Sequence, residues 1–486
     1  MHRLFHSIPL RGVLLCVAGL SLFCYASASL AFRTDRFLIQ PKASISNARL
    51  ATLHASLGCK PLRTFDRIRG LQVVQVPPGH NVTDLIAAYN QSGLVEYAEP
   101  DHIGHVFTTP NDPGFSNGSL WALNNFGQSG GTPHADIDAI HAWDILTSAS
   151  NIIVAVLDTG IRYTHEDLAT NMWTNPNDSS HGTNAVAGGT DATDDGTHGT
   201  PVAGIIGAAG NNGKGVTGVA WRVQLMACKC FNSSGNGIVS DAIACIDYAR
   251  ANGAQIINAS FGFAASQSLS NAVWTARDAG IIIVAACGNE GTNIDLNPPY
   301  PAGIHLDNVI SVAYTTRNDT LASPSNYGAT NVHLAAPGDQ IYSTFPATDF
   351  FYFTQSGSSF AVPYVAGACA LLKARYPADT HQVIISRILN GTDPLPSLAG
   401  KCTTGGRLNL RKAISPPINL SVLSATNNTF LFRVSAGPNR TFTIQTSPDL
   451  LNWSSISTNT TSDSGTHNFT DTVMPPARFY RAVSTP

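Results

Sequence analysis

The chain has 486 residues, of which 43% are hydrophobic and only 12% are charged, and its formal net charge is −3. A chain of this length is too long for one hydrophobic core, so we expect a globular protein of two or three domains. The near-neutral charge and the lack of a long basic run exclude a strong electrostatic attraction to nucleic acid or to an anionic membrane.

Residues 1–31 have the pattern of a secretory signal peptide. An apolar run from Gly12 to Tyr25 follows basic residues, and small residues at Ala26, Ala28 and Ala31 suit a signal peptidase. A membrane anchor is the alternative, but the run is shorter than the ~20 residues that cross a bilayer. We expect a secreted, extracellular protein with no membrane span in its mature chain, and the periplasm or the cell surface are the other possible destinations.

The cysteines leave two interpretations open. Of the nine, Cys16 and Cys24 lie in the signal region and Cys59 soon after it, which leaves Cys228, Cys230, Cys245, Cys287, Cys369 and Cys402. Secretion permits disulfides, and six cysteines allow 15 connectivities, between which the sequence does not choose. The alternative is a metal site at Cys228 and Cys230, but no second cysteine or histidine pair stands at zinc-finger spacing.

Residues 32–108 alternate between strand-like and helix-like patterns. Strands are expected near 36–42, 70–78 and 95–106, and helices near 46–58 and 82–93. The proline-rich stretch "TTPNDPGF", residues 108–115, then separates this small α+β unit from the rest of the chain. Such joints are commonly exposed and open to cleavage.

Residues 109–415 alternate between apolar strands and amphipathic helices. Strands are expected near 152–158, 223–228, 254–260, 280–287 and 308–313, and helices near 200–209, 239–253, 268–280 and 360–377. This alternation predicts an α/β domain whose mainly parallel sheet is covered by helices on both faces. Functional sites of such sheets lie at the carboxyl ends of the strands.

Residues 416–486 differ in composition, because Thr, Ser and Asn dominate them. Short strands are expected near 430–436, 440–447, 467–472 and 478–483, separated by turns. We predict a small β-sandwich. The sequence does not tell whether this module binds glycans, docks a sorting system or stabilises its neighbour.

The stretch "IIVAVLDTGI", residues 152–161, places Asp158 at the end of an apolar strand. Two unrelated protease chemistries use such an aspartate: paired aspartates that activate water, or one aspartate that orients a histidine beside a serine. The first needs a second Asp-Thr/Ser-Gly after another apolar strand. The remaining candidate, Asp463, lies in a polar segment, which disfavours an aspartic protease.

Three further motifs supply what the serine chemistry needs. His198 stands among small residues in "DDGTHGTPVAG", and Ser359 opens an expected helix in "SGSSFAVPYVAG", with Pro363 in its first turn. The amides at a helix start can stabilise an oxyanion. Asn289 follows the apolar strand of "VAACGNEG", where its side-chain amide can donate a second hydrogen bond.

In their order Asp, His, Asn and Ser, these motifs resemble the subtilisin-type serine proteases of the subtilase family, in its thermitase-like secreted branch. The resemblance covers about residues 32–415 and implies a subtilisin-like three-layer α/β/α fold. It further implies a serine endopeptidase that hydrolyses peptide bonds of proteins through an acyl-enzyme. Asp158 would orient His198, His198 would act as base and then acid, and Ser359 would attack the scissile carbonyl.

The resemblance also implies substrate-binding residues. Two segments would pair with the extended substrate backbone, and a third would line the first specificity pocket, with Glu290 at its rim. We expect a medium-sized or aromatic apolar side chain before the cleaved bond. The residues are Ser260, Phe261 and Gly262, then Gly235, Asn236 and Gly237, then Ala286, Cys287 and Gly288.

A structural calcium site is a further implication of the resemblance. The implied ligands are all oxygens, which suits Ca²⁺. The alternative is a glycine-rich turn beside two unrelated surface acids. The ligands would be the side chains of Asp112, Asp167 and Asn212 and the carbonyls of Ala209, Lys214 and Val216.

Residues 32–108 resemble the propeptide of the family, which implies an intramolecular chaperone and inhibitor that is removed by self-cleavage. The cut would fall between about His105 and Asp112. The expected partners are therefore protein or peptide substrates and the chain's own propeptide, and we expect a monomer.

The sequence departs from the family at three positions around the nucleophile: Ser358, Phe360 and Tyr364 stand where Thr, Met and His are common. Cys287 beside Asn289 is also unusual, and we interpret it as a buried small side chain, with a regulatory thiol as the alternative. A catalytically silent scaffold that acts as a secreted binding or adhesion protein is the competing function. A metal-dependent hydrolase is disfavoured, because no His-Glu-x-x-His motif occurs.

Overall fold

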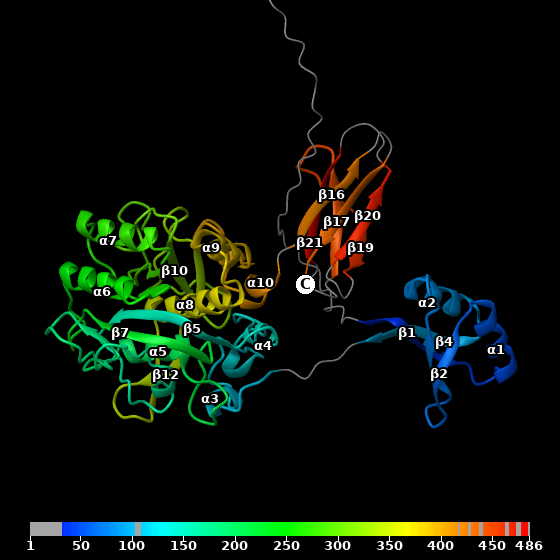
Figure 1. Ribbon diagram of the computed structural model, residues 1–486, viewed down its shortest axis with the longest axis horizontal. Coiled ribbons are helices and arrows are strands. Elements are labelled where there is room, and N and C mark those ends of the chain that lie inside the picture. The colour runs from blue at the N-terminus through cyan, green and yellow to red at the C-terminus, as the bar shows by residue number, and fades with distance from the viewer. Residues whose placement is uncertain are drawn as a thin grey trace, which may run out of the picture. The chain divides into compact units, whose positions relative to one another are not determined.

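The computed structural model describes residues 32–102, 108–416, 418–425, 429–436, 441–461, 466–472 and 478–484. The predicted signal peptide, Asp463 and part of the predicted cleavage range lie outside the described residues. The contacts within the chain separate a middle domain, residues 107–415, from the segments before and after it (Figure 1).

The N-terminal segment folds as the predicted α+β unit. Its sheet is antiparallel where β1 meets β3 and β4, with the order β2-β3-β1-β4, and Phe37, Ile39 and Val74 are buried in its core. The elements are β1 Phe32–Pro41, α1 Asn47–Ser56, β2 Lys60–Phe65, β3 Leu71–Gln75, α2 Val82–Gln91 and β4 Val95–His102. The sequence pattern missed β2, whose exposed residues show no apolar period.

The middle domain is built on a sheet of nine strands with the order β14-β15-β11-β10-β9-β8-β5-β7-β6. Every pair in it is parallel except β14 with β15. The strands are β5 Ser148–Asp158, β6 Gly182–Asn184, β7 Arg222–Lys229, β8 Ile256–Ala259, β9 Ile282–Ala286, β10 Val309–Thr315, β11 Leu334–Pro337, β14 Asp393–Pro394 and β15 Gly406–Arg407.

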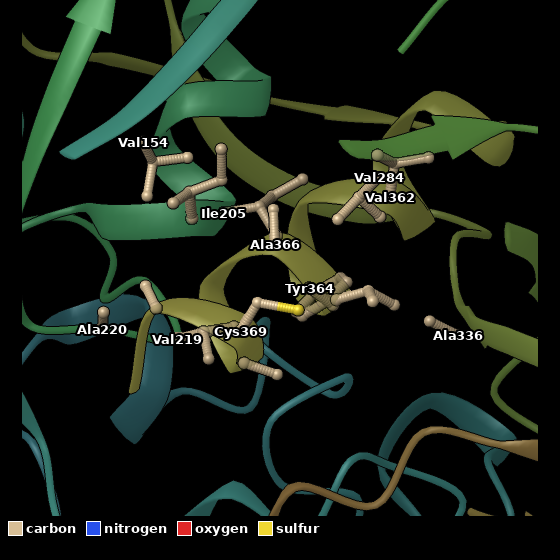
Figure 2. Packing of buried hydrophobic residues seen from close by; sticks show 14 of the residues in the cluster. Val154, Ile205, Val219, Ala220, Val284, Ala336, Val362, Tyr364, Ala366 and Cys369 are labelled. Atoms are coloured by element: carbon tan, nitrogen blue, oxygen red, sulfur yellow. The ribbon is translucent and has the colours of Figure 1, made fainter. Parts of the chain in front are cut away.

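Helices cover both faces of this sheet. On β5, Val154 and Val156 face one core and Ala155 and Leu157 face the other, as alternation along a strand requires. Figure 2 shows the first core, where Val154 gathers with residues of α5 and α8. The helices are α3 Pro113–Ser116, α4 Ala139–Trp143, α5 Gly199–Gly207, α6 Val239–Ala251, α7 Gln267–Asp278, α8 Ser358–Arg375, α9 His381–Asn390 and α10 Leu410–Ile414. The predicted three-layer α/β/α architecture is confirmed.

An antiparallel hairpin, β12 Ile341–Phe345 with β13 Phe351–Gln355, leads into α8. The sequence pattern did not predict this hairpin. It lies in the connection between β11 and Gly357, directly before α8.

The C-terminal segment forms two three-stranded sheets, β16-β17-β20 and β19-β18-β21, that share one core. Phe430 of β17 stacks on Tyr480 of β21 with 5.0 Å between ring centroids, which joins the two sheets as a small β-sandwich. The strands are β16 Asn419–Ala425, β17 Phe430–Ser435, β18 Thr441–Ser447, β19 Ser454–Thr460, β20 Thr466–Asp471 and β21 Phe479–Ser484.

Candidate active site

Asp158 and His198 form a hydrogen-bonded pair at the carboxyl end of β5. Asp158 is the last residue of that strand and is 3% exposed, and His198 immediately precedes α5. The imidazole Nδ1 lies 2.8 and 2.9 Å from the two carboxylate oxygens of Asp158. The backbone N–H of Thr159 donates to the same carboxylate at 2.7 Å, which fixes its orientation.

A close approach of two backbones sets this pair. A Cβ placed on Gly199 would lie 2.1 Å from the carbonyl oxygen of Gly160 and 3.0 Å from the side chain of Asp158. Only glycine therefore lets the start of α5 lie directly against the end of β5. This is the steric reason for the small residue that directly follows His198 in the sequence.

Ser359 lies in the first turn of α8, two residues after Gly357, whose φ is +147°. The Oγ of Ser359 donates a hydrogen bond to the carbonyl of Ser260 at 3.0 Å, and the Oγ of Ser260 donates to the carbonyl of Ser359 at 2.9 Å. These reciprocal bonds tie the nucleophile candidate to the segment that follows β8.

Pro363 explains why Ser260 is needed there. We expected this proline in the first helical turn, but α8 begins at Ser358, so Pro363 lies inside the helix. A proline has no N–H, and the residue four positions earlier, Ser359, therefore loses the helical partner of its carbonyl. The hydroxyl of Ser260 supplies that missing hydrogen bond.

Asn289 lies beside the start of α8. Its Oδ1 accepts the backbone N–H of Ser358 at 2.8 Å, while the backbone N–H of Gly288 donates to the hydroxyl of Ser358 at 3.2 Å. Because the Oδ1 is held in this way, the Nδ2 is the part of the amide that can donate to another group. The side-chain amide and the N-terminus of α8 are thus neighbours.

No hydrogen bond between described residues joins the side chains of His198 and Ser359, since the Ser359 hydroxyl donates to Ser260. The ring of Phe360, the residue after Ser359, nevertheless lies 5.4 Å from the ring of His198, so the imidazole lies against the first turn of α8. Catalytic hydrogen bonds are often formed only when substrate is bound.

The pKa of His198 is shifted by its surroundings. Burial disfavours the imidazolium, but the charge of Asp158, its hydrogen bond and the charge of Asp194 outweigh burial. The pKa of His198 consequently lies above its ordinary value of 6.5.

Phe261 of the first predicted substrate segment belongs to a cluster of three phenylalanines. The rings of Phe231, Phe261 and Phe263 lie with centroids 5.0 to 5.7 Å apart. A Cβ on Gly237 would lie 2.5 Å from the carbonyl of Cys230, so that glycine lets its segment lie against the end of β7. Gly235, Asn236 and Gly262 are exposed, whereas Ser260 is 5% exposed.

The predicted pocket residues differ in burial. Ala286 and Cys287 are buried, and Gly288 is partly exposed. The thiol of Cys287 donates to the carbonyl of Asn326 at 3.2 Å, and burial raises its pKa to about 12. Glu290 accepts the backbone N–H of Asn289 and the side-chain amide of Asn326. A protonated, buried thiol agrees with our interpretation of Cys287 as a small packing residue.

Sequence reasoning missed two charged residues of this site. Asp194 is 5% exposed and bonds to Thr159 and Thr200, the residues beside Asp158 and Gly199. Lys229 is 4% exposed, and its Nζ donates to the carbonyl of Thr159 at 2.5 Å and to Asp195 at 2.6 Å. The signal for Asp194 was its place in the same short motif as His198.

Asp112 and Asp167, the two predicted metal-ligating acids, are both fully buried. Asp112 accepts the backbone N–H groups of Asn211 and Asn212, and Asp167 accepts the N–H of Val216 at 2.9 Å. Burial, and then the charge of Asp167, raises the pKa of Asp112, against the effect of its hydrogen bonds. The alternative of two unrelated surface acids is wrong, because both carboxylates are inside.

Three of the remaining predicted ligands belong to the hydrogen-bond network around Asp167. The amide Nδ2 of Asn212 donates to Asp167 at 2.8 Å, and the N–H of Ala209 donates to the carbonyl of Asp167. Lys214 uses its ammonium on Glu166, and its N–H donates to the Oδ1 of Asn212.

A residue of the hairpin completes this region. The hydroxyl of Tyr352, which the sequence analysis did not predict there, donates to Asp167 at 2.9 Å. In the described part of the chain, no cationic side chain bonds to Asp112 or Asp167, so these two buried carboxyl groups have no cationic partner there. That donor set fits a cation that prefers oxygen ligands.

The cysteines are not paired. All seven cysteines in the described ranges are free and buried: Cys59, Cys228, Cys230, Cys245, Cys287, Cys369 and Cys402. The disulfides that secretion would permit are therefore not formed in the structure. Nor do the described residues contain a cluster of three or more His, Cys, Asp or Glu side chains that could hold a metal ion, which leaves the cysteine metal site without support.

None of the helices among the described residues combines the length and the apolar character that a bilayer crossing requires.

Comparison with known proteins identifies the family of the chain. Residues 149–405 match the Subtilase family, and residues 26–101 match the Fervidolysin N-terminal prodomain. The chain is 32% identical to "Thermophilic serine proteinase" of Bacillus sp. (strain AK1) over 79% of this chain and 88% of that protein. It is 35% identical to "Thermitase" of Thermoactinomyces vulgaris over 63% of this chain and 99% of that protein.

Solved structures also match the fold of this chain. A protease from Pseudoalteromonas arctica PAMC 21717 superposes with a TM-score of 0.55 at 30% identity, covering 63% of this chain and 99% of that one. The family match, the relatives and the strand-end site lead to one conclusion: the chain is a serine endopeptidase that belongs to the subtilase family and carries an N-terminal prodomain.

Proposed function

We propose that this protein is a secreted, calcium-binding serine endopeptidase that is made as a zymogen and processes itself through Asp158, His198 and Ser359. The observation that carries the proposal is the Asp158–His198 pair, with Nδ1 2.8 Å from the carboxylate, beside the start of the helix that bears Ser359. The proposed parts are a signal peptide at 1–31, a propeptide at 32–108, a catalytic domain at 109–415 and a β module at 416–486.

In the proposed mechanism, Asp158 holds His198 with its Nδ1 protonated, so the Nε2 is free to accept a proton. Substrate binding breaks the bond from Ser359 to the Ser260 carbonyl and turns the hydroxyl toward His198. Ser359 then attacks the scissile carbonyl while His198 takes its proton. His198 returns that proton to the leaving amine, and water hydrolyses the acyl-enzyme by the same steps.

The negative charge on the carbonyl oxygen needs donors. Asn289 and the backbone N–H of Ser359 are the proposed ones, since the amide lies beside the N-terminus of α8. One such donor contributes about 3 to 4 kcal/mol to transition-state stabilisation, a magnitude established on a subtilisin asparagine.

The proposed substrates are proteins in extended conformation. Backbone pairing with Ser260–Gly262 on one side and Gly235–Gly237 on the other tolerates many sequences. The phenylalanine cluster, which includes Phe261 of the first segment, supports a preference for apolar side chains before the cleaved bond. Ala286 and Gly288 would line the pocket for the residue directly before it.

Calcium is proposed for the region of Asp112 and Asp167. Two buried carboxylates without a protein cation among the described residues support it, and Asn212 with the carbonyls of Ala209, Lys214 and Val216 would complete an oxygen ligand set. Bound there, the ion would neutralise the two charges and tie the residues before α3 to the loop after α5.

Secretion and inhibition by the propeptide are proposed from the sequence and from the relatives. Two relatives at 38% and 35% identity are named "Minor extracellular protease Epr" and "Cell wall-associated protease" of Bacillus subtilis (strain 168). The match of the N-terminal segment to a prodomain supports a zymogen.

Intact mass after secretion tests the proposal. The parent chain would lose its first ~110 residues while Ser359→Ala would keep its propeptide, because removal of a triad serine from a subtilisin costs about a millionfold in turnover. Ser356→Ala is the matched control: this hydroxyl bonds Asp339 and the backbone of Gln340, three residues before Ser359. It should mature like the parent.

Two results would speak against self-processing. If parent and Ser359→Ala shorten alike, another protease makes the cut, and peptide hydrolysis by the two mature proteins must then differ for Ser359 to be the nucleophile. If neither shortens and neither hydrolyses peptides, the silent-scaffold alternative is correct.

A further inference from the structure

We propose that Asp194 is a positioning residue of this active site, which ties the segment bearing Asp158 to the segment bearing His198 and keeps a second negative charge beside the imidazole. The inference rests on the proposed triad and assigns a role that the triad itself does not include.

Asp194 binds both segments with its two oxygens. Its Oδ1 accepts the hydroxyl of Thr159 at 2.8 Å and the N–H of Gly196 at 3.0 Å. Its Oδ2 accepts the hydroxyl of Thr200 at 2.6 Å and the N–H of the same residue at 2.9 Å. The side chain is 5% exposed, so these four bonds replace water almost completely.

The network closes on itself between the two catalytic segments. Thr159, next to Asp158, donates to Asp194 and accepts the N–H of Gly199, next to His198, at 3.0 Å. A displacement of Asp194 therefore moves both partners of the Asp158–His198 pair. The effect reaches the reacting atoms only through those two residues, which makes Asp194 a positioning residue and not a catalytic one.

An amide cannot replace this carboxylate. The N–H groups of Gly196 and Thr200 donate to different oxygens, and an asparagine has only one oxygen. In Asp194→Asn, one of these backbone groups would face an NH₂ group and lose its bond. The threonine hydroxyls can rotate, so the backbone bonds are the reason for a carboxylate.

The charge has a separate effect on His198. The charges that act on the imidazole are those of Asp158 and Asp194, and both favour its protonated form. The nearby cations have other partners: Lys229 pairs with Asp195, and the guanidinium of Arg162 pairs with Asp349. Burial raises the pKa of Asp194 itself, and its bonds to Thr200 and Thr159 oppose that.

The experiment is the pH dependence of peptide hydrolysis by the full, secreted enzyme. For Asp194→Asn we expect kcat to fall about 10- to 100-fold with KM little changed, because the nucleophile and base are misplaced. We also expect the acid limb of kcat/KM to move to lower pH, because one charge that favours the imidazolium is gone.

Asp194→Glu separates position from charge. It keeps the carboxylate but lengthens the side chain, so kcat should fall while the acid limb stays at the pH of the parent. Asp191→Asn is the matched control, since it removes an exposed carboxylate three residues earlier that bonds Tyr163 and Thr193. This control should keep both the kcat and the acid limb of the parent.

Three outcomes would overturn the inference. One is an unchanged kcat and acid limb in Asp194→Asn, and another is a lowered kcat with an unshifted limb, which would leave only a structural role. If Asp194→Asn does not fold by circular dichroism, Thr200→Val decides: it removes one hydroxyl donor and leaves the charge, and parent-like kcat would be the third contrary outcome. Failure of the triad itself is recognised separately, because the parent would then be no more active than Ser359→Ala.

Discussion

Two pairs of buried carboxylates lie in the middle domain, and they are compensated in opposite ways. Asp158 and Asp194 share their surroundings with the imidazole of His198, whose protonation they favour. Asp112 and Asp167 accept N–H and O–H groups alone among the described residues. The same kind of side chain thus favours a proton on a base in one place and, within the described ranges, has no cationic partner in the other.

The difference teaches how local chemistry separates catalysis from stability. A carboxylate pair that faces a titratable base changes reactivity, because the base responds to charge at neutral pH. A pair that faces only neutral donors raises the free energy of the folded state until a cation binds. Substitutions in the two pairs should therefore affect different measurements.

The largest effect is expected from exchanging one member of each pair for its amide. Asp158→Asn should lower kcat about 10⁴-fold with little change in Tm, because the imidazole loses its orientation. Asp167→Asn should keep kcat at low temperature and lower Tm. Steady-state kinetics and scanning calorimetry on both variants check this. A lowered Tm in Asp158→Asn, or a lowered kcat in Asp167→Asn, would contradict the contrast between the two pairs.

Calcium removal should reproduce the second variant in the parent protein. If the ion saturates its site at about 100 times its Kd, its loss removes about 2.7 kcal/mol of stability, and Tm falls by several degrees. Asp112→Ala should have the low Tm already and should not respond to a chelator. A chelator that lowers the Tm of both proteins equally would place the calcium elsewhere.

The pH profile of the parent enzyme sharpens the first half of the comparison. His198 must be neutral to accept a proton, and its pKa is raised, so kcat/KM should rise with pH through a midpoint above 6.5. A midpoint at or below that value would mean that the two carboxylates do not act on the base as the structure indicates.

The smallest effect concerns oxidation next to the catalytic pair. Phe360 is 4% exposed and lies against His198. The sulfoxide of a methionine at this position would crowd the imidazole, and phenylalanine does not undergo that oxidation. Mild peroxide should therefore inactivate the enzyme slowly, and Phe360→Met should make the loss faster. Rapid inactivation of the parent with all its thiols still titratable after denaturation would contradict this.

The sequence predicted the strands and the helices that position Asp158, His198, Asn289 and Ser359, because apolar runs and small residues mark these elements locally. It could not predict the partners of Asp194 or the hydrogen bond that Ser260 donates to the Ser359 carbonyl. Those bonds join residues from different elements, and their existence depends on register and close packing. The wrong placement of Pro363 has the same origin, since helix starts are set by capping contacts and not by periodicity.

The proposed calcium region was predicted by resemblance alone, and the burial of its two acids could not be predicted from composition. Asp112 lies within the proline-rich joint and Asp167 stands in a polar loop, so each looks like a surface residue in the sequence. In the structure, Tyr352 of the β12–β13 hairpin and the N–H of Val216 both donate to the buried carboxylate of Asp167, and neither contact is visible in the sequence.

The free, buried cysteines have a practical consequence. In the described ranges every thiol is shielded by the fold, so a maleimide dye would react only with molecules that have opened. The rate of labelling would then report how often the enzyme exposes its interior, which for a protease is also how often it presents itself as a substrate to its neighbours. Thiols that the fold leaves unpaired would thus serve as a gauge of autolysis.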